Sequence, residues 1–425
     1  MQENSGYMQI KLTAPHRISG RIVLPSSKSI SNRALTISAL SGCESGLENV
    51  SDCDDTRVMR QWLSERPHTI DIGAAGTAMR FSTALLTVCD GSHVITGSER
   101  MKNRPIGVLV DALCQLGAKV EYVEKEGYPP LKIEGTPELE GGEVCVSGGV
   151  SSQYISALLM IGPYLKKGLK IISSDKMISR PYIDMTLAIM QDYGAKAYWE
   201  GDRSIVVEPV PYKPCPYVVE SDWSAASYWY EMVALAPNDD VEVVLPGLFA
   251  QSLQGDSRGA NLFQQLGVST QYRENEVVLS RNGQCVSRLD YDFVEIPDLA
   301  QTFVVTCCML GIPFHFTGLQ SLKIKETDRI EALKKELAKL GFGIEDRHDS
   351  ELIWDGVRMP VGSISSDEIA IDTYEDHRMA MAFAPVALKR GELLVNHPQV
   401  VTKSYPHYWE DLKSVGFGIK ENQRK

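Results

Sequence analysis

Hydrophobic and polar positions follow a pattern that recurs five times along the chain. Each time, an amphipathic stretch ends in an apolar residue and a glycine, and an alternating segment follows. These glycines are Gly117, Gly194, Gly267, Gly341 and Gly416, which lie 77, 73, 74 and 75 residues apart. Glycine after the last apolar turn can adopt the left-handed conformation that closes a helix. Each copy therefore predicts a helix, a glycine cap and a strand within a small α/β unit.

A sixth, shortened copy precedes these five. Residues 58–65 resemble the corresponding helix, but Ser64 lies only 53 residues before Gly117. We expect this unit to have lost its closing strands. Six units, one of them shortened, fit two domains of three units each.

Composition narrows the class of protein. The chain has 425 residues, 43% of them hydrophobic, and a net charge of −12, which argues against a nucleic-acid partner. No apolar run approaches a membrane span, and residues 1–11 are polar, so we expect a cytoplasmic protein without a membrane partner. The nine cysteines form no CxxC pair and the histidines show no ligand spacing. We expect reduced core cysteines and no metal.

Cations gather where helices are expected to begin. Lys28 and Arg33 open one helix, in company with Ser29 and Ser31, and four later helices carry a cation near their start. Those four are Arg104, Arg180, Arg329 and Lys403. A cation at a helix N-terminus opposes the macrodipole, so the set favours a bound anion. The alternatives are that a serine merely caps the first helix and that the cations pair with carboxylates such as Asp184 or Asp328.

A small-residue turn, Gly73–Arg80, precedes another expected helix and would let backbone amides approach an anion. Neither a P-loop nor a GxGxxG motif accompanies it, so ATP and NAD lack support.

Three charged stretches supply candidates for proton transfer. They are residues 296–298, after an expected strand, and residues 325–329 and 375–379, each opening a helix. Asp298 with Lys325 or Glu326 would serve as base and acid. The alternative is that Asp328 and Glu331 form a capping box. His377 is either a proton carrier or a structural residue.

Eight segments, in order along nearly the whole chain, resemble the EPSP synthase (3-phosphoshikimate 1-carboxyvinyltransferase) family. They are SKSISNR (27–33), AGTAMR (75–80), RMKNRPIG (100–107), SSQYISALLM (151–160), SRPYID (179–184), IPD (296–298), KETDR (325–329) and DHRMAM (376–381). The resemblance implies an α/β (α+β) fold of two domains, each of three βαβαββ units in an inverse αβ barrel-like arrangement. The first domain would span residues 27–220, and the second residues 1–26 and 221–425.

The resemblance also implies the reaction. The enolpyruvyl group of phosphoenolpyruvate would pass to the 5-hydroxyl of shikimate 3-phosphate, with release of phosphate and without a cofactor. Ligands of shikimate 3-phosphate would be Lys28, Ser29, Arg33, Ser151, Ser152, Gln153, Ser179, Asp298 and Lys325. Ligands of phosphoenolpyruvate would be Lys28, Gly76, Arg104, Gln153, Arg329, Arg378 and Lys403.

Roles in proton transfer follow from the same resemblance. Asp298 would accept the proton of the attacking hydroxyl, and Glu326 or Lys325 would protonate the methylene carbon, with Lys28 in the same catalytic set. The protein is expected to act as a monomer. Ala74 and Phe81 depart from the family pattern, which usually has asparagine and proline there. The alternatives are a transferase that uses UDP-N-acetylglucosamine and a non-catalytic anion-binding relative.

Overall fold

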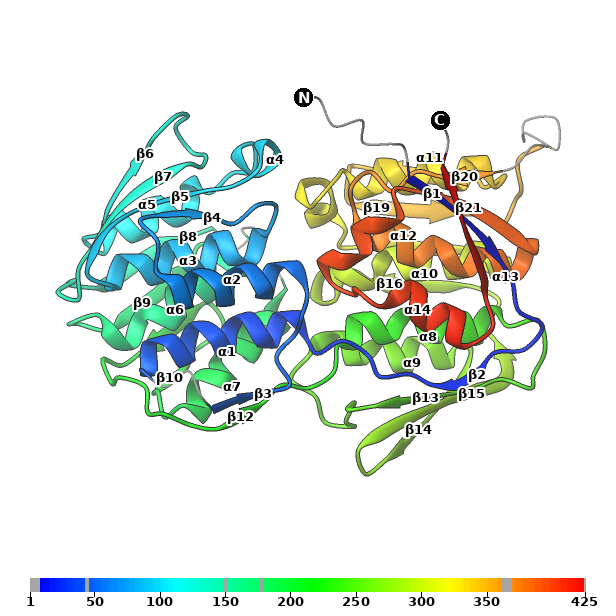
Figure 1. Cartoon of the computed structure of the whole chain (residues 1–425), viewed down its shortest axis with the longest axis horizontal. Helices are drawn as coiled ribbons and strands as arrows, with labels where there is room; N and C mark the ends of the chain where they lie inside the picture. The colour runs from blue at the N-terminus through cyan, green and yellow to red at the C-terminus, as the bar shows by residue number, and fades with distance from the viewer. Residues whose placement is uncertain are drawn as a thin grey trace. The chain divides into compact units, whose positions relative to one another are not determined.

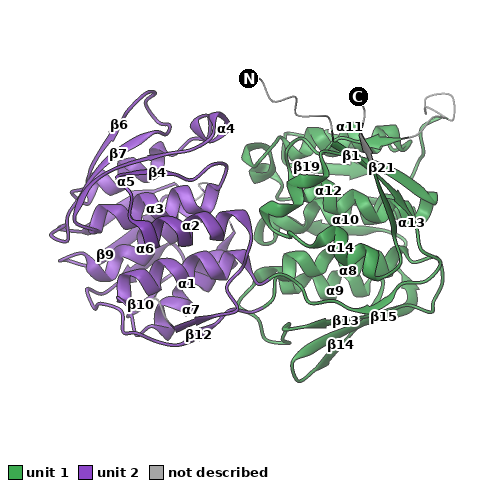
Figure 2. Ribbon diagram, in the orientation of Figure 1, with its two compact units in different colours: residues 1–25, 221–425 green, residues 26–220 purple. Residues whose placement is uncertain are grey.

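The computed structural model describes residues 8–42, 46–147, 151–175, 177, 179–360 and 369–423. The chain divides into two compact units, coloured separately in Figure 2. The terminal unit comprises Met1–Pro25 and Ser221–Lys425, and the inserted unit comprises Ser26–Glu220. The prediction from sequence placed Ser26 with the N-terminal residues, but in the structure Ser26 belongs to the inserted unit. Residues 1–7 of the polar N-terminal stretch lie outside the described residues.

Within the part of the chain that the structure describes, five four-stranded sheets share one topology. In the first, β4 (Thr69–Asp71) runs parallel to β5 (Gly91–Thr96). Strand β7 (Leu131–Gly135) pairs antiparallel with β5, and β6 (Lys119–Tyr122) pairs antiparallel with β7. The second sheet of the inserted unit repeats this order with β8 (Gly142–Val146), β9 (Leu169–Ser173), β11 (Ser204–Val207) and β10 (Ala197–Glu200).

The terminal unit contains the other three sheets. Two are β2-β13-β15-β14 and β16-β17-β19-β18. Their strands are β2 (Ser19–Arg21), β13 (Glu242–Pro246), β14 (Leu266–Arg273), β15 (Glu276–Cys285), β16 (Leu289–Asp292), β17 (Phe314–Thr317), β18 (Glu345–Arg347) and β19 (Glu351–Trp354). In the third, β1 (Met8–Thr13) lies between β21 (Glu392–Asn396) and β22 (Gly418–Gln423), and β20 (Ala370–Ile371) pairs with β21. The N-terminal strand thus completes the sheet of the last repeat.

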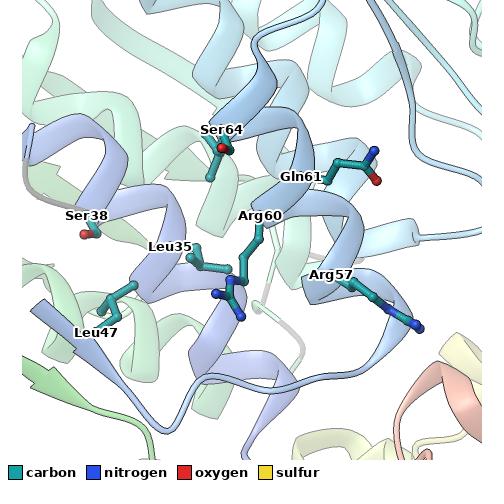
Figure 3. Close-up of a pocket in the computed structure, with 8 residues that line it drawn as sticks. Leu35, Ser38, Leu47, Arg57, Arg60, Gln61 and Ser64 are labelled. Atoms are coloured by element: carbon teal, nitrogen blue, oxygen red, sulfur yellow. The ribbon is translucent and has the colours of Figure 1, made fainter. Parts of the chain in front are cut away.

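The sixth repeat is shortened, as predicted. Among the described residues, its sheet has two short parallel strands, β3 (Leu47–Glu48) and β12 (Tyr217–Val218). Its two helices, α1 (Lys28–Ser41) and α2 (Asp54–Glu65), are retained. Beside them lies a hollow of about 420 Å³, lined in part by Leu35, Leu63 and Arg60 (Figure 3).

The remaining helices complete the units (Figure 1). Those of the inserted unit are α3 (Gly76–Val88), α4 (Glu99–Lys102), α5 (Gly107–Gln115), α6 (Ser152–Ile161) and α7 (Arg180–Asp192). Those of the terminal unit are α8 (Trp223–Leu235), α9 (Gly259–Gln264), α10 (Ala300–Leu310), α11 (Arg329–Lys339), α12 (His377–Phe383), α13 (Ala387–Arg390) and α14 (Tyr408–Ser414). Short 3-10 helices are η2 (Gly162–Tyr164), η3 (Gly255–Arg258), η4 (Phe293–Glu295), η5 (Pro297–Leu299), η6 (Gln320–Ile324), η8 (Ala384–Val386) and η9 (Pro398–Lys403).

Each unit has its own hydrophobic core, built on the first helix of each repeat. Helices α3 and α12 are buried along their whole length, and α6, α8 and α10 nearly so. Helices that are apolar on all sides belong in an interior, and here they pack against one another within each unit. The predicted fold class, an α/β (α+β) two-domain fold, is therefore confirmed.

All five glycines predicted as caps adopt positive φ angles, between 82° and 98°. Gly267, however, lies within β14, where the pairing with β15 shifts register, and does not cap a helix. Each glycine follows the helix expected before it, namely α5, α7, α9, α11 or α14. The expectation that the cysteines are core residues is wrong for most of them. Among the described cysteines only Cys53, Cys307 and Cys308 are buried, because the others lie on the outer faces of strands, near helix ends or in loops. Cys43 lies outside the described residues.

Candidate active site

In the inserted unit, the predicted ligands lie at the first turns of neighbouring helices. Lys28 is the first residue of α1, Gly76 is the first residue of α3, and Gln153 lies in the first turn of α6. The Gln153 amide donates a hydrogen bond to the Thr77 hydroxyl at 3.3 Å, which ties the starts of α6 and α3 together. These helix starts bring unsatisfied backbone N–H groups and their positive dipole ends to one region of the unit.

The cap of α1 differs from the predicted alternatives. The Ser27 hydroxyl, rather than that of Ser29 or Ser31, accepts a hydrogen bond from the backbone N–H of Ile30. Ser31 is buried and accepts from the backbone N–H of Ser51. Ser29 is therefore not used as the cap, which is consistent with its predicted role as a ligand.

Arg33 lies in the interior of the inserted unit, only 2% exposed. Its guanidinium donates to Thr186 Oγ1 at 2.7 Å, Ser156 Oγ at 3.1 Å and the backbone oxygens of Ser29 and Tyr182 at 2.8 and 3.1 Å. Burial lowers the Arg33 pKa to about 10. The side chain therefore keeps its charge at neutral pH.

Gly76 and Arg104 are packed against each other. A Cβ atom on Gly76 would lie 2.3 Å from Nη1 of Arg104, so only glycine leaves room for the guanidinium in this position. The Arg104 Nε is buried and has no hydrogen-bond partner within the part of the chain that the structure describes. Arg80 donates to the carbonyl oxygens of Gly76 and Pro105 at 3.0 and 3.1 Å and so fixes both segments.

The predicted serines occupy two further helix starts. Ser151 caps α6, its hydroxyl accepting from the Gln153 N–H at 3.3 Å, and Ser152 is the first residue of that helix. Ser179 precedes α7 with a φ of 53°, a left-handed conformation that is unfavourable for a residue other than glycine. Strained backbone of this kind concentrates at functional sites.

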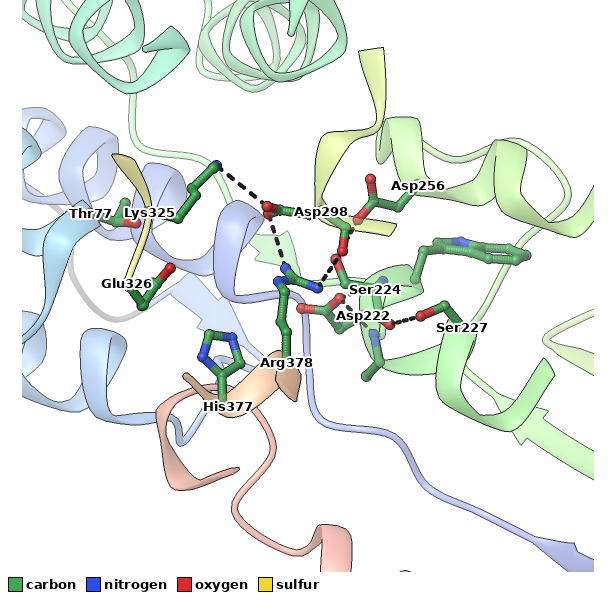
Figure 4. Close-up of polar contacts among 12 residues, drawn as sticks. Thr77, Asp222, Ser224, Ser227, Asp256, Asp298, Lys325, Glu326, His377 and Arg378 are labelled. Atoms are coloured by element: carbon green, nitrogen blue, oxygen red, sulfur yellow. Dashed lines mark hydrogen bonds and ion pairs between the residues drawn. The ribbon is translucent and has the colours of Figure 1, made fainter. Parts of the chain in front are cut away.

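In the terminal unit, Asp298 lies among three cations, two of which face it in Figure 4. Its carboxylate accepts from Arg378 Nη2 at 3.0 Å and from Arg329 Nη1 at 3.2 Å, and Lys325 Nζ lies 3.4 Å away. The residue lies in η5, between β16 and α10, and not directly after a strand as expected. The side chain remains 20% exposed, so it can reach a ligand.

The charges around Asp298 decide its protonation state. Burial acts to raise its pKa, but the neighbouring charges of Arg378, Lys325 and Arg329 outweigh burial and hold the pKa well below the usual range. Asp298 is therefore ionised at neutral pH and able to accept a proton.

Arg329 organises this cluster from a fully buried position, 1% exposed. Its guanidinium donates hydrogen bonds to Asp376 at 2.7 Å, to Asp298 at 3.2 Å and to Glu326 at 2.9 Å. Burial acts to lower its pKa, yet the carboxylates of Asp376, Glu326 and Asp298 raise it. Glu326 also pairs with Lys403 at 3.0 Å. Asp376 in turn caps α12 by accepting from the N–H of Arg378 at 2.9 Å.

Three of the cations expected at helix starts pair with carboxylates, which weakens the inference from sequence that all of them bind an anion. Arg180 lies 3.9 Å from Asp184, and Arg329 and Lys403 have the partners described above. Arg329 pairs with Asp376 and not with the expected Asp328, which caps α11 by accepting from the Glu331 N–H. Among the cations expected at helix starts, Arg104 retains the strongest case for an anionic ligand.

His377 is 1% exposed, and its Nδ1 lies 3.8 Å from Asp376. Its burial favours the structural interpretation over the proton carrier.

Sequence reasoning missed several residues of this region. Asp376, Thr77 and Tyr228 each hold a predicted ligand in place, Tyr228 through a 3.4 Å hydrogen bond with Arg378. Asp376 and Thr77 lie within the segments DHRMAM and AGTAMR described above. Their polar side chains beside predicted ligands could have indicated that they hold those ligands by hydrogen bonds.

Beside Asp298 lies another aspartate, Asp256, which is buried. Asp256, 5% exposed, accepts a hydrogen bond from the hydroxyl of Ser224, and Asp222 caps α8 next to it (Figure 4). Burial and then the charge of Asp298 raise the Asp256 pKa to about 6.

Within the described ranges, no group of three or more His, Cys, Asp or Glu side chains is arranged to hold a metal ion. No helix in these ranges is long and apolar enough to cross a membrane.

Comparisons with known proteins agree along the length of the chain. The family model for EPSP synthase (3-phosphoshikimate 1-carboxyvinyltransferase) matches residues 12–66 and 61–412. A 3-phosphoshikimate 1-carboxyvinyltransferase of Bacteroides fragilis (strain YCH46) is 59% identical over 97% of this chain and 99% of its own length. One from Sulfurovum sp. (strain NBC37-1) is 36% identical over 94% and 97%.

A solved structure of EPSP synthase from Acinetobacter baumannii shares the fold. It superposes with a TM-score of 0.77 at 19% identity and covers 98% of this chain and 100% of that one. The chain therefore belongs to the EPSP synthase (3-phosphoshikimate 1-carboxyvinyltransferase) family, whose enzymes transfer the enolpyruvyl group of phosphoenolpyruvate to shikimate 3-phosphate in the shikimate pathway.

Proposed function

We propose that this chain performs that transfer with the residues predicted from its sequence. The observation that carries the proposal is Asp298, an ionised carboxylate held by Arg378, Arg329 and Lys325 at 3.0 to 3.4 Å. An ionised carboxylate that can reach a ligand is the group that a general base for the attacking hydroxyl requires.

The ligand residues fall into two sets. We propose that Lys28, Ser29, Arg33, Ser151, Ser152, Gln153 and Ser179, with Asp298 and Lys325, bind shikimate 3-phosphate. Lys28, Gly76, Arg104, Gln153, Arg329, Arg378 and Lys403 serve phosphoenolpyruvate. Within the second set, Arg329 serves as a positioning residue, because it is buried and holds Asp298 and Glu326 in place through ion pairs.

The chemistry requires two proton movements in the addition step. The 5-hydroxyl oxygen bonds to C2 of phosphoenolpyruvate and gives its proton to Asp298, while C3 gains a proton from Lys325 or Glu326. The deprotonated Lys325 or Glu326 then takes a proton back from C3, the C2–C3 double bond forms again as the bond from C2 to the phosphate oxygen breaks, and phosphate leaves with the proton that Asp298 held. Atoms and electrons balance without a cofactor.

The cations around Asp298 can link substrate binding to the strength of this residue as a base. In the free protein they stabilise the carboxylate and make it a weak base. Substrate anions that recruit Arg378 and Lys325 would weaken that stabilisation and raise the pKa of Asp298. Binding of both substrates would thus prepare the base for proton transfer.

Acceptor choice tests this function. Phosphate release is measured with phosphoenolpyruvate and either shikimate 3-phosphate or UDP-N-acetylglucosamine as acceptor. We expect release only with shikimate 3-phosphate. Release only with UDP-N-acetylglucosamine would assign the other transferase, and no release with either acceptor from folded protein would favour the non-catalytic relative.

We also propose that the working enzyme is a monomer, since one chain supplies every residue assigned above. Light scattering at assay concentration would then give a mass near 47.1 kDa, and twice that mass would contradict the proposal.

A further inference from the structure

Arg33 is a buried cation whose hydrogen-bond partners in the described structure are all neutral. Four of its N–H groups are used by two hydroxyls and two backbone carbonyls. No carboxylate of the described residues lies within ion-pair distance of it. Burying an unpaired charge is costly, so another group must help to keep the guanidinium in place.

Phe81 is placed to do so. It lies in α3, its side chain is fully buried, and the Cζ atom of Arg33 lies 5.4 Å from the centre of its ring. The negative face of an aromatic ring attracts a guanidinium at this distance, and the attraction grows when both are removed from water. The ring can therefore lower the cost of burying the charge.

We propose that Phe81 is a positioning residue that holds the Arg33 guanidinium charged and oriented for the anionic acceptor substrate. The proposal rests on the proposed role of Arg33 as a ligand of shikimate 3-phosphate. An aromatic face suits this task better than a carboxylate, because it stabilises the cation without neutralising it. The net positive charge stays available to the substrate, and the guanidinium remains protonated at neutral pH.

Packing alone would predict a different result. Phe81 lies on the same helix as Gly76 and Thr77, so a substitution that disturbed α3 would change the binding of both substrates. An electrostatic role through Arg33 would change mainly the binding of shikimate 3-phosphate. The experiment must therefore vary the charge distribution of the ring while keeping its shape.

Fluorinated phenylalanines at position 81 meet this need. The full chain is prepared with phenylalanine and with its 4-fluoro, 3,5-difluoro and pentafluoro analogues there, and Kd is measured for each substrate. We expect Kd for shikimate 3-phosphate to rise stepwise with fluorination, by about 3-fold to 30-fold overall. Kd for phosphoenolpyruvate should stay within about twofold, as expected if α3 packing is unchanged.

Two controls keep the outcomes separate. The same analogues at Phe293, a buried ring of the terminal unit that packs against other aromatic rings, should leave both Kd values unchanged. A flat series at position 81, or an equal rise for both substrates, would overturn the role of Phe81. If Arg33→Gln left the affinity for shikimate 3-phosphate unchanged, the assignment of Arg33 itself would fail, and this proposal with it.

Discussion

Asp298 and Asp256 are neighbouring aspartates of the terminal unit whose pKa values move in opposite directions. Three cations hold the pKa of Asp298 down, although burial acts against them. Asp256 has a hydroxyl as its hydrogen-bond donor, and burial together with the charge of Asp298 raises its pKa. One carboxylate is therefore kept ionised while the other is able to carry a proton near pH 6.

The raised pKa of Asp256 makes stability depend on pH. Between an unfolded value near 3.9 and the folded value of about 6, the folded protein binds more protons than the unfolded chain. This residue therefore stabilises the fold less as pH rises through that window. Relative to wild type, we expect Asp256→Asn to gain roughly 1 to 3 kcal/mol of unfolding free energy between pH 4 and pH 6.

Urea unfolding at several pH values measures this difference. Asp240→Asn is the matched control, because Asp240 is exposed and pairs only with Arg17 among the described residues. If the free energies of unfolding of Asp256→Asn and wild type changed in parallel between pH 4 and pH 6, the raised pKa of Asp256 would be wrong.

Gly76 gives a second prediction for a single residue. A methyl group there would meet Arg104 Nη1 at 2.3 Å, so the guanidinium must move away. We expect Gly76→Ala to raise KM for phosphoenolpyruvate by about tenfold or more and to change KM for shikimate 3-phosphate less.

A double-mutant cycle tests the cause of this effect. If the displaced guanidinium is responsible, Gly76→Ala should raise KM for phosphoenolpyruvate little further when Arg104 is already replaced by alanine. Fully additive losses would show that the methyl group acts in some other way.

Sequence predicted individual roles best where the partner is close along the chain. The Asp328 cap follows a local rule and is present, with Glu331 three residues on. The partners of Arg329 were not predicted, because Asp298 and Asp376 lie 31 and 47 residues away and only folding brings them together.

Among the elements, the repeats were predictable because a glycine at a helix end is a local requirement. The sheet of the last repeat was not, because its third strand, β1, pairs with β21 from nearly 400 residues away. The shortened repeat was predicted from its spacing. Its described sheet pairs two strands where the other repeats have four, so the shortening falls on the strands.

Helix α2 of the shortened repeat offers a prediction at this scale. Its Met59 side chain is fully buried in the core, while Arg60 is exposed and lines the hollow beside α1 and α2. We expect Met59→Ala to lower the free energy of unfolding by about 2 to 5 kcal/mol and Arg60→Ala to change it by less than about 0.5.

Chemical denaturation of the two variants makes the comparison, since both remove a long side chain from one helix. Equal losses would mean that α2 does not pack as a regular element of the unit.

At the scale of the whole molecule, the chain carries a net charge of −12 yet gathers cations around its proposed site. Each unit has a separate hydrophobic core, and each contributes part of the proposed ligand set. Asp298, Lys325 and Glu326 come from the terminal unit, and Lys28 and Arg104 come from the inserted unit. The proposed function therefore assigns roles to residues of both units.

If Asp298 accepts the proton of the attacking hydroxyl, its loss should affect turnover far more than binding. For Asp298→Asn we would measure both turnover and the Kd values of phosphoenolpyruvate and shikimate 3-phosphate. Glu295→Gln is the control, because it removes a surface carboxylate three residues away. We expect Asp298→Asn to lower kcat by about 10²-fold to 10⁴-fold while both substrates still bind. A kcat near that of wild type would show that Asp298 is not the base.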